Sequence, residues 1–212
     1  MRMCALAFVA RAPPTRRWNE RRTHMTLDIQ TLTIPGPLLI SVGRFGDARG
    51  YFSETYNARA FAEAGIGLSF VQDNHSYSAM RGTVRGLHFQ RPPKAQGKLV
   101  RVLRGRILDV FVDIRKGSAQ YGAHGTAELA AKNGEQLFVP QGFAHGFCTL
   151  EPDTEVLYKT SDYYAPETEG GILWNDPALS IPWPDFAGSV VSPKDTELPV
   201  LAKLDSPFGF TP

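Results

Sequence analysis

Two stretches of the sequence bring together side chains that can move protons or hold a negative charge. Residues 82–99 contain Arg85 and His88 and, after a Pro-Pro turn, Lys98. Residues 134–145 repeat part of this spacing and end in a second histidine. An imidazole can accept or donate a proton near neutral pH, and neighbouring cations can hold an anionic group. We interpret the two stretches as facing halves of one pocket.

The segments that carry these side chains show the alternation typical of β-strands. Between Leu99 and Ile114 apolar residues recur at every second position, with a break at Arg104-Gly105. Further strands are predicted at residues 135–139, 144–150 and 154–160. The reactive side chains are therefore expected on strands and not on helices.

Helical signals are few. The clearest helix is predicted over Asn57–Gly65, with Asn57 as its cap and Gly65 as its stop. Residues 27–53 read as short extended pieces separated by Gly and Pro. Seven of the sixteen prolines lie from Asp176 onward, which predicts an irregular tail with room for one small helix. Many short strands joined by Gly/Pro turns predict an antiparallel sandwich or barrel.

Length and charge narrow the class of protein. With 212 residues the chain is long enough for one domain, which we place at residues 25–212. Residues 1–24 contain six arginines and one acid, so the remaining chain carries 17 basic against 20 acidic side chains. A mildly acidic folded part argues against nucleic acid or an anionic membrane as a partner.

The first 24 residues are expected to be a disordered leader or an extension from an upstream start codon, with Met25 as the natural beginning. Their apolar run is short and a block of arginines follows it, which makes export the weaker interpretation. Cys4 and Cys148 lie far apart, so a buried free thiol in a reducing compartment, the cytoplasm, is predicted. No stretch approaches the ~20 apolar residues of a membrane span.

The spacing of glycine, proline and histidine resembles the two halves of the cupin signature. Gly82 precedes His88 by five intervening residues, and Gly134 is followed by Pro140-x-Gly142-x-x-His145. The resemblance implies an all-β fold, a cupin-type double-stranded β-helix or jelly roll with a few short peripheral helices. Lys98 stands where a metal-binding cupin has an acid, and an ammonium repels a divalent cation. We therefore expect a pocket without a metal.

More of the chain is similar to one family, the dTDP-4-dehydrorhamnose 3,5-epimerases of deoxysugar nucleotide biosynthesis. The match covers roughly residues 27–200, a domain-sized stretch. Its separated motifs, all in one order, are Phe45–Glu54, Phe70–Ser76, Arg85–His88, Gln96–Arg101, Pro140–Phe147, Tyr158-Lys159, Tyr163–Pro166 and Trp174-Asn175-Asp176.

The resemblance assigns the chemistry. Epimerisation next to a ketone needs a base to remove the α-proton, a positive group to hold the enolate oxygen and an acid on the opposite face. By resemblance His88 is the base and Asp195 its partner, Lys98 is the counter-charge, and Tyr158 is the acid. No cofactor is implied.

The resemblance also assigns substrate contacts, which suit a dTDP-linked 4-keto-6-deoxy sugar. They are Arg49, Glu54, Gln72, Asp73, Asn74, Arg85, Lys98, His145, Tyr164, Glu169 and Lys194. Asp109 is a further candidate for an inward polar group near His88. His24, His75 and His124 are expected to be solvated.

A homodimer is implied, in which the region of Arg49 and Glu54 reaches the neighbour's pocket. Other interpretations remain open at this point: a single-site epimerase or ketoisomerase, a metal-dependent cupin enzyme, and a catalytically silent sugar-nucleotide binding module.

Overall fold

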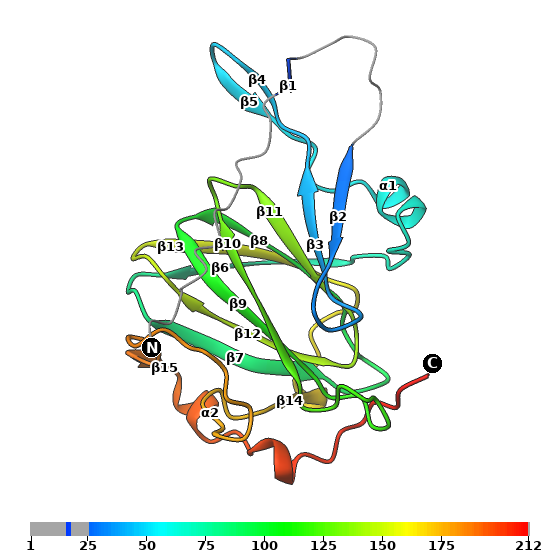
Figure 1. Cartoon of the computed structure of the whole chain (residues 1–212), viewed down its shortest axis with the longest axis vertical. Helices are drawn as coiled ribbons and strands as arrows, with labels where there is room; N and C mark the ends of the chain where they lie inside the picture. Colours follow the sequence, from blue (N-terminus) through cyan, green and yellow to red (C-terminus); the bar gives the residue numbers. More distant parts are fainter. Residues whose placement is uncertain (1–15, 18–25, 212) are drawn as a thin grey trace, which may run out of the picture.

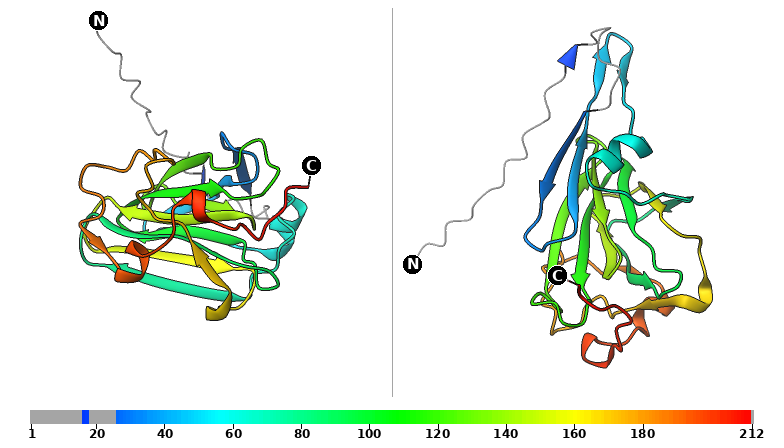
Figure 2. Two further views of the ribbon diagram at one scale, coloured as in Figure 1. Left: turned by 90° about the horizontal axis from the view of Figure 1, so that it is seen from below. Right: turned by 90° about the vertical axis from the view of Figure 1, so that its right-hand side faces the viewer.

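Two six-stranded sheets face each other in the computed structural model, which describes residues 16–17 and 26–211. Nearly all neighbouring strands are antiparallel, and the sheets form two layers (Figures 1 and 2). The predicted all-β jelly roll with short peripheral helices is confirmed. The predicted leader, with Cys4 and His24, lies outside the described residues except for Arg16–Arg17.

The first sheet carries His88 and is built from strands of the middle and end of the chain. Its spatial order is β10 (His124–Ala130), β9 (Arg106–Asp113), β12 (Phe143–Thr149), β7 (Thr83–Gln90) and β14 (Glu169–Gly171), and β15 (Val190–Val191) also pairs with β7.

The second sheet carries Lys98 and Tyr158. Its order is β2 (Leu27–Thr31), β3 (Leu38–Val42), β11 (Glu135–Val139), β8 (Lys98–Arg104), β13 (Thr154–Thr160) and β6 (Gln72–Ser78).

Short elements surround the two sheets. A hairpin of β4 (Phe45–Asp47) and β5 (Gly50–Phe52) joins β1 (Arg16–Arg17) and extends beyond the body (Figure 1). The helices are α1 (Ala58–Glu63), α2 (Pro193–Thr196), η1 (Pro166–Thr168) and η2 (Leu201–Lys203), the last two being 3₁₀ helices.

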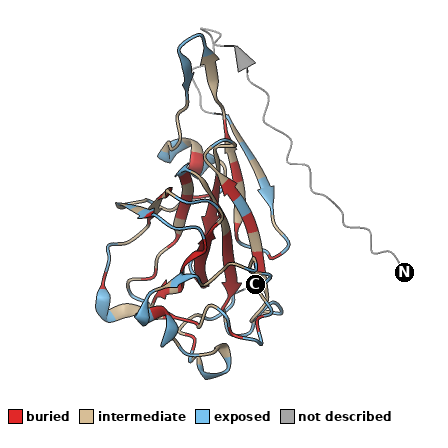
Figure 3. Ribbon diagram, turned by 90° about the vertical axis from the view of Figure 1, so that its left-hand side faces the viewer, coloured by how far each residue is buried: buried red, intermediate tan, exposed pale blue. Residues whose placement is uncertain are grey.

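The core lies between the sheets and explains the alternation in the sequence. Val100 and Val102 of β8 pack there against Ile107 and Phe111 of β9. Val110 and its in-phase neighbours point to the other side of β9, where the C-terminal segment covers them. Buried residues therefore concentrate in the central strands (Figure 3).

Local signals in the sequence match the elements that form. Asn57 caps α1 by accepting from the amides of Arg59 and Ala60, and Gly65 follows it with φ +88°. The break at Arg104-Gly105 separates β8 from β9, and β13 spans the predicted residues 154–160. Cys148 is buried and unpaired, as expected, and burial raises its pKa to about 11.

One expectation needs correction. The stretches 82–99 and 134–145 were expected to face each other as two halves of a pocket, but His88 and His145 are cross-strand neighbours in the same sheet. The opposite wall comes from Lys98 and Tyr158 on β8 and β13. The reason is that each stretch crosses between the sheets. The turn after β7 leads to β8 in the second sheet, and the turn after β11 leads to β12 in the first. No helix in the described part of the chain is long and apolar enough to cross a membrane.

Candidate active site

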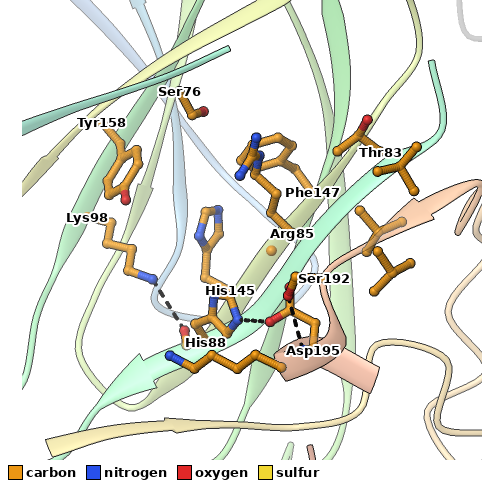
Figure 4. Close-up of a pocket in the computed structure, with 15 residues that line it drawn as sticks. Ser76, Thr83, Arg85, His88, Lys98, His145, Phe147, Tyr158, Ser192 and Asp195 are labelled. Atoms are coloured by element: carbon orange, nitrogen blue, oxygen red, sulfur yellow. Dashed lines mark hydrogen bonds and ion pairs between the residues drawn. The ribbon is translucent and has the colours of Figure 1, made fainter. Parts of the chain in front are cut away.

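A cavity of about 400 Å³ opens between the sheets and brings four separated residues together. His88, Lys98, Tyr158 and Asp195, the four predicted catalytic residues, all line it. Lys98 and Tyr158 lie on one side, and His88 and Asp195 on the other (Figure 4). These residues lie far apart in the sequence, and the pairing of strands and the return of the C-terminal segment bring them together.

His88 is oriented by Asp195. The His88 Nε2 lies 2.6 Å from Asp195 Oδ1, and the other carboxylate oxygen accepts from the Gly86 amide at 3.2 Å. Burial raises the pKa of Asp195, but the hydrogen bonds from His88, Gly86 and Ser192 outweigh it and leave the pKa below its usual value. The carboxylate is thus ionised near neutral pH and can only accept a hydrogen bond from Nε2, which in a neutral imidazole leaves the lone pair on Nδ1.

Asp195 is placed by a short helix. Ser192 caps α2, and its hydroxyl oxygen accepts from the Asp195 amide at 3.1 Å. Ser192 was not among the predicted residues, although Ser-x-x-acid is a signature of a helix start. The cap fixes the turn from which the carboxylate points at His88.

A β-bulge aims His88 into the cavity. Between the pairs His145↔His88 and Phe147↔Arg85, β7 contains one residue more than β12. Gly86 sits at this point with φ +123°, and a Cβ there would lie 2.6 Å from the Gly146 Cα. Only glycine fits this close approach of two backbones.

Lys98 supplies a cation to the opposite wall. Its ammonium donates to the His88 carbonyl oxygen at 3.3 Å. Burial lowers its pKa to about 8, although the charges of Asp109 and Glu169 oppose the shift. The ammonium therefore remains charged at neutral pH but is poorly solvated, which strengthens its attraction for an anion in the cavity.

A second histidine and aspartate pair lies at the cavity wall. His145 Nε2 is 2.7 Å from Asp109 Oδ1, and both side chains are buried. The sequence placed Asp109 near His88, but its partner is His145, because β12 lies between β9 and β7. Within the described residues the other oxygen of Asp109 is buried without a hydrogen-bond partner. The charge of Asp109 raises the pKa of Lys98.

Tyr158 is held in its protonated form. Burial raises the pKa of this phenol, an effect opposed by the charge of Arg85. A neutral hydroxyl can donate a proton or a hydrogen bond. Tyr158 therefore offers a donor on the wall opposite His88.

A smaller hollow of about 100 Å³ adjoins the cavity and shares His88, Lys98 and Tyr158 with it. Gln72, Asn74, Tyr164 and Glu169, four of the predicted substrate contacts, line this hollow. It offers amides, an aromatic ring and a carboxylate, groups that suit a pyrimidine nucleoside.

Hydrogen bonds hold these groups in place. Gln72 Nε2 donates to Asn74 Oδ1 at 2.9 Å, and the Tyr164 amide donates to Gln72 Oε1 at 3.0 Å. Glu169 Oε2 accepts from the Tyr164 hydroxyl at 3.0 Å and from Lys194 Nζ at 2.5 Å. Burial raises the pKa of Glu169, but these two bonds lower it overall.

Other predicted contacts fall into two groups. Arg85, His145 and Lys194 line the main cavity. Arg49, Glu54 and Asp73 line neither the cavity nor the adjoining hollow of their own chain. Arg49 lies on the projecting hairpin, where its side chain is 90% exposed and pairs with Asp47.

The remaining predicted positions lie on the surface. Asp73 pairs with Lys159 at 2.8 Å. His75 is exposed and pairs with Glu155 at 3.0 Å. Within residues 16–17 and 26–211 there is no cluster of three or more His, Cys, Asp or Glu side chains that could hold a metal ion.

Taken together, the cavity holds an imidazole hydrogen-bonded to a carboxylate, a neutral phenol across from it and a poorly solvated ammonium. This combination can remove a proton next to a carbonyl, hold the resulting oxyanion and return a proton from the other side.

Comparisons with known proteins agree with this geometry. A family model described as dTDP-4-dehydrorhamnose 3,5-epimerase matches residues 31–203. The enzyme of that name from Sinorhizobium fredii is 49% identical over 181 residues, which cover 85% of this chain and 93% of the relative. The one from Pseudomonas aeruginosa is 50% identical over 175 residues, covering 82% and 96%.

A solved structure agrees as well. The dTDP-4-dehydrorhamnose 3,5-epimerase from Bacillus anthracis, with TDP and PPi bound, has a TM-score of 0.79 and 48% sequence identity, and the match covers 82% of this chain and 99% of that one. The chain therefore belongs to the dTDP-4-dehydrorhamnose 3,5-epimerase family.

Proposed function

We propose that this protein converts dTDP-4-dehydro-6-deoxy-D-glucose to dTDP-4-dehydro-L-rhamnose by inverting C3 and C5, without a cofactor, in dTDP-rhamnose biosynthesis. The observation that carries the proposal is the placement of the His88–Asp195 pair and of Lys98 and Tyr158 on opposite walls of one cavity. The two inverted carbons both neighbour the 4-keto group, so one set of groups can serve both.

Each inversion is a pair of proton transfers. His88 removes the proton on the carbon next to the ketone, and the electron pair moves onto the ketone oxygen to give an enolate. Lys98 stabilises the oxyanion, and the ionised Asp195 stabilises the imidazolium that forms. Tyr158 then donates its proton to the other face of the same carbon, and the carbonyl re-forms.

Proton balance is restored by solvent. The Tyr158 phenolate takes up one proton and the His88 imidazolium releases one, so the net reaction is an isomerisation. The elevated pKa of Tyr158, caused first by burial, favours rapid reprotonation. Because the protons exchange with water, each inversion leaves a solvent-derived hydrogen at the carbon.

The adjoining hollow serves the nucleotide. Tyr164 stacks on the thymine, and Gln72 and Asn74 offer amides to its edge or to the sugar. Arg85 and Lys194 offer charge to the diphosphate between the two compartments. Asp73 is assigned as an outer contact by resemblance alone.

The protein acts as a homodimer in this proposal. Arg49 and Glu54 lie outside their own chain's cavity, and the hairpin that carries Arg49 extends beyond the body (Figure 2). A second copy would receive these side chains at its pocket. Light scattering is expected to give the mass of a dimer, and a fully active monomer would contradict this.

We also assign the protein to the cytoplasm. The support is chemical, because the described cysteine, Cys148, is buried and forms no disulfide, as is usual in proteins of a reducing compartment. Fractionation of cells that express the full chain tests this assignment.

The proposed reaction is tested by incubating the protein with a dTDP-linked 4-keto-6-deoxyglucose in deuterated water and following both ring positions by NMR. Deuterium at C3 and C5 together with inversion at both is expected. Exchange and inversion at one carbon would indicate a single-site epimerase, and movement of the ketone a ketoisomerase.

Two further results would replace the proposal. Tight binding of dTDP without any exchange would indicate a binding module. Activity that a chelator abolishes and a divalent ion restores would indicate a metal-dependent cupin enzyme. Full activity after exhaustive chelation is expected.

A further inference from the structure

Asp195 reaches the cavity on a long segment that leaves the sheets and returns. The segment runs from Asp176 to Leu201 and carries α2 with Lys194 and Asp195 (orange to red in Figure 1). On one side of Asp195 it is held by β15, whose Val190 and Val191 pair with the start of β7. On the C-terminal side of Asp195, the segment is held by a contact that lies outside the cavity.

Asp176, which lies outside the site, joins the two ends of this segment by hydrogen bonds. The residue is buried, with 5% of its surface exposed, and it lines neither the cavity nor the adjoining hollow. One carboxylate oxygen accepts from the Leu201 amide at 2.7 Å, and the other accepts from the Ala178 amide at 3.0 Å. A backbone hydrogen bond from the Leu173 amide to the Pro199 carbonyl, at 2.8 Å, lies beside it. The two ends of the segment are therefore joined at one side chain.

The chain just before Asp176 is hydrogen-bonded to β7, the strand that carries His88. Gly171 of β14 pairs with His88, and Leu87 and Ile172 exchange both backbone hydrogen bonds, at 2.9 and 3.3 Å. Asp176 follows Ile172 in the chain after Leu173, Trp174 and Asn175. Through it, the strand that places the base also sets where the segment with the base's partner returns.

We propose that Asp176 is a positioning residue for the His88–Asp195 pair. The inference rests on the proposed roles of these two residues. The His88–Asp195 distance is 2.6 Å, so a shift of the segment by about 1 Å would break the bond, and a misplacement of that size can slow a reaction by about 10²-fold. Asp176 touches no reacting atom and acts only through Asp195.

The test is a double-mutant cycle of Asp176→Ala and Asp195→Asn. Rates are measured in the full chain and normalised to the concentration of dTDP-binding sites, so that unfolded protein does not count. Asp176→Ala is expected to lower kcat by about 10- to 100-fold in the natural background and by less than about twofold when Asp195→Asn is already present. The dTDP affinity should change by less than about threefold, because Gln72, Asn74 and Tyr164 lie on other elements.

A conservative variant and a control variant show whether the effect on kcat comes from the lost hydrogen bond of Asp176. Asp176→Asn keeps an oxygen for the Leu201 amide and should restore kcat to within about fivefold of the natural protein. Asp205→Asn removes the charge of an exposed side-chain carboxylate that pairs with Lys116, and it should leave kcat unchanged.

If Asp176→Ala does not fold, Leu201→Pro replaces it in the cycle. Proline removes the donor, and the preceding Val200, at φ −66° and ψ 155°, accepts a following proline.

Two failures can be told apart. An equal loss from Asp176→Ala in both backgrounds would show a general structural role and overturn the inference. Natural turnover in Asp195→Asn itself would overturn the proposed function of the pair, and the inference with it.

Discussion

Lys98 must be charged to stabilise an enolate, but its ammonium is buried. Burial lowers the pKa of this ammonium to about 8, which still leaves it charged at neutral pH. A depressed pKa in the folded state means that folding costs free energy below pH 8, where the ammonium is charged in both states. The cost disappears as pH rises from about 8 to the unfolded value near 10.5.

This predicts opposite effects of Lys98→Met on stability and activity. At pH 7 the variant should unfold with a free energy higher by at most about 3 kcal/mol, and the difference should vanish above pH 10.5. Its turnover should fall by about 10²- to 10³-fold. Urea unfolding at both pH values and a kinetic assay check this.

Lys94→Met is the matched control. This lysine pairs with Asp162 at the surface, with 44% of its side chain exposed. Neither stability nor turnover should change much there. A Lys98→Met variant that was less stable than the natural protein at pH 7 would contradict the cost of burying its charge.

Tyr158 is predicted to control inversion and not proton removal. Tyr158→Phe keeps the ring but removes the proton that its raised pKa preserves. Deuterium should still enter at one carbon, returned by the His88 side, while few molecules complete the inversion. NMR of the sugar measures both quantities. Natural product yield from this variant would remove Tyr158 from the mechanism.

The bulge in β7, next to His88, turns this side chain toward the cavity. Gly86→Ala would put a Cβ 2.6 Å from the Gly146 Cα and 2.8 Å from the His145 carbonyl oxygen. We expect a loss of about 3 kcal/mol or more in the free energy of unfolding, or no folded protein. Gly67→Ala, with open space around it, is the control and should be nearly neutral. Denaturation of the two variants decides this, and equal stability would contradict the role of the bulge.

Strands and caps were predictable from the sequence because their signals are local. Period-two alternation placed β8, β9 and β13, and Asn57 and Gly65 bounded the predicted helix around α1. The resemblance to one family supplied the four predicted catalytic residues, all of which line the cavity, but not Ser192. It could not supply the pairing of Asp109 with His145, which depends on the order of strands in the sheet.

The contact between Asp176 and Leu201 shows the same limit. The two residues lie 25 positions apart in an irregular segment, and no periodicity marks such a contact. The sequence predicted the tail to be irregular but not that it closes on itself. Contacts between loops become visible only once the chain path is known.

At the scale of the whole molecule, the proposed dimer makes a prediction about mixed subunits. His88→Asn lacks the base, and Arg49→Ala lacks the side chain offered to the neighbour. When both variants are unfolded and refolded together, half of the dimers combine one of each, and each such dimer has one intact site. About a quarter of the natural activity should appear, well above either variant alone.

The control for this experiment is mixing without unfolding, which should give no recovery while subunits stay paired. Activity after refolding that equals only the average of the two variants would contradict a site shared between subunits. Arg49 would then serve its own chain or no site at all.

The most direct measurement concerns the base. His88→Asn is incubated with the 4-keto sugar nucleotide in deuterated water, with dTDP affinity measured in parallel. Entry of deuterium at both C3 and C5 should slow by about 10²- to 10⁴-fold while dTDP binds as in the natural protein. Exchange at both carbons near the natural rate would contradict the assignment of His88 as the group that removes the protons.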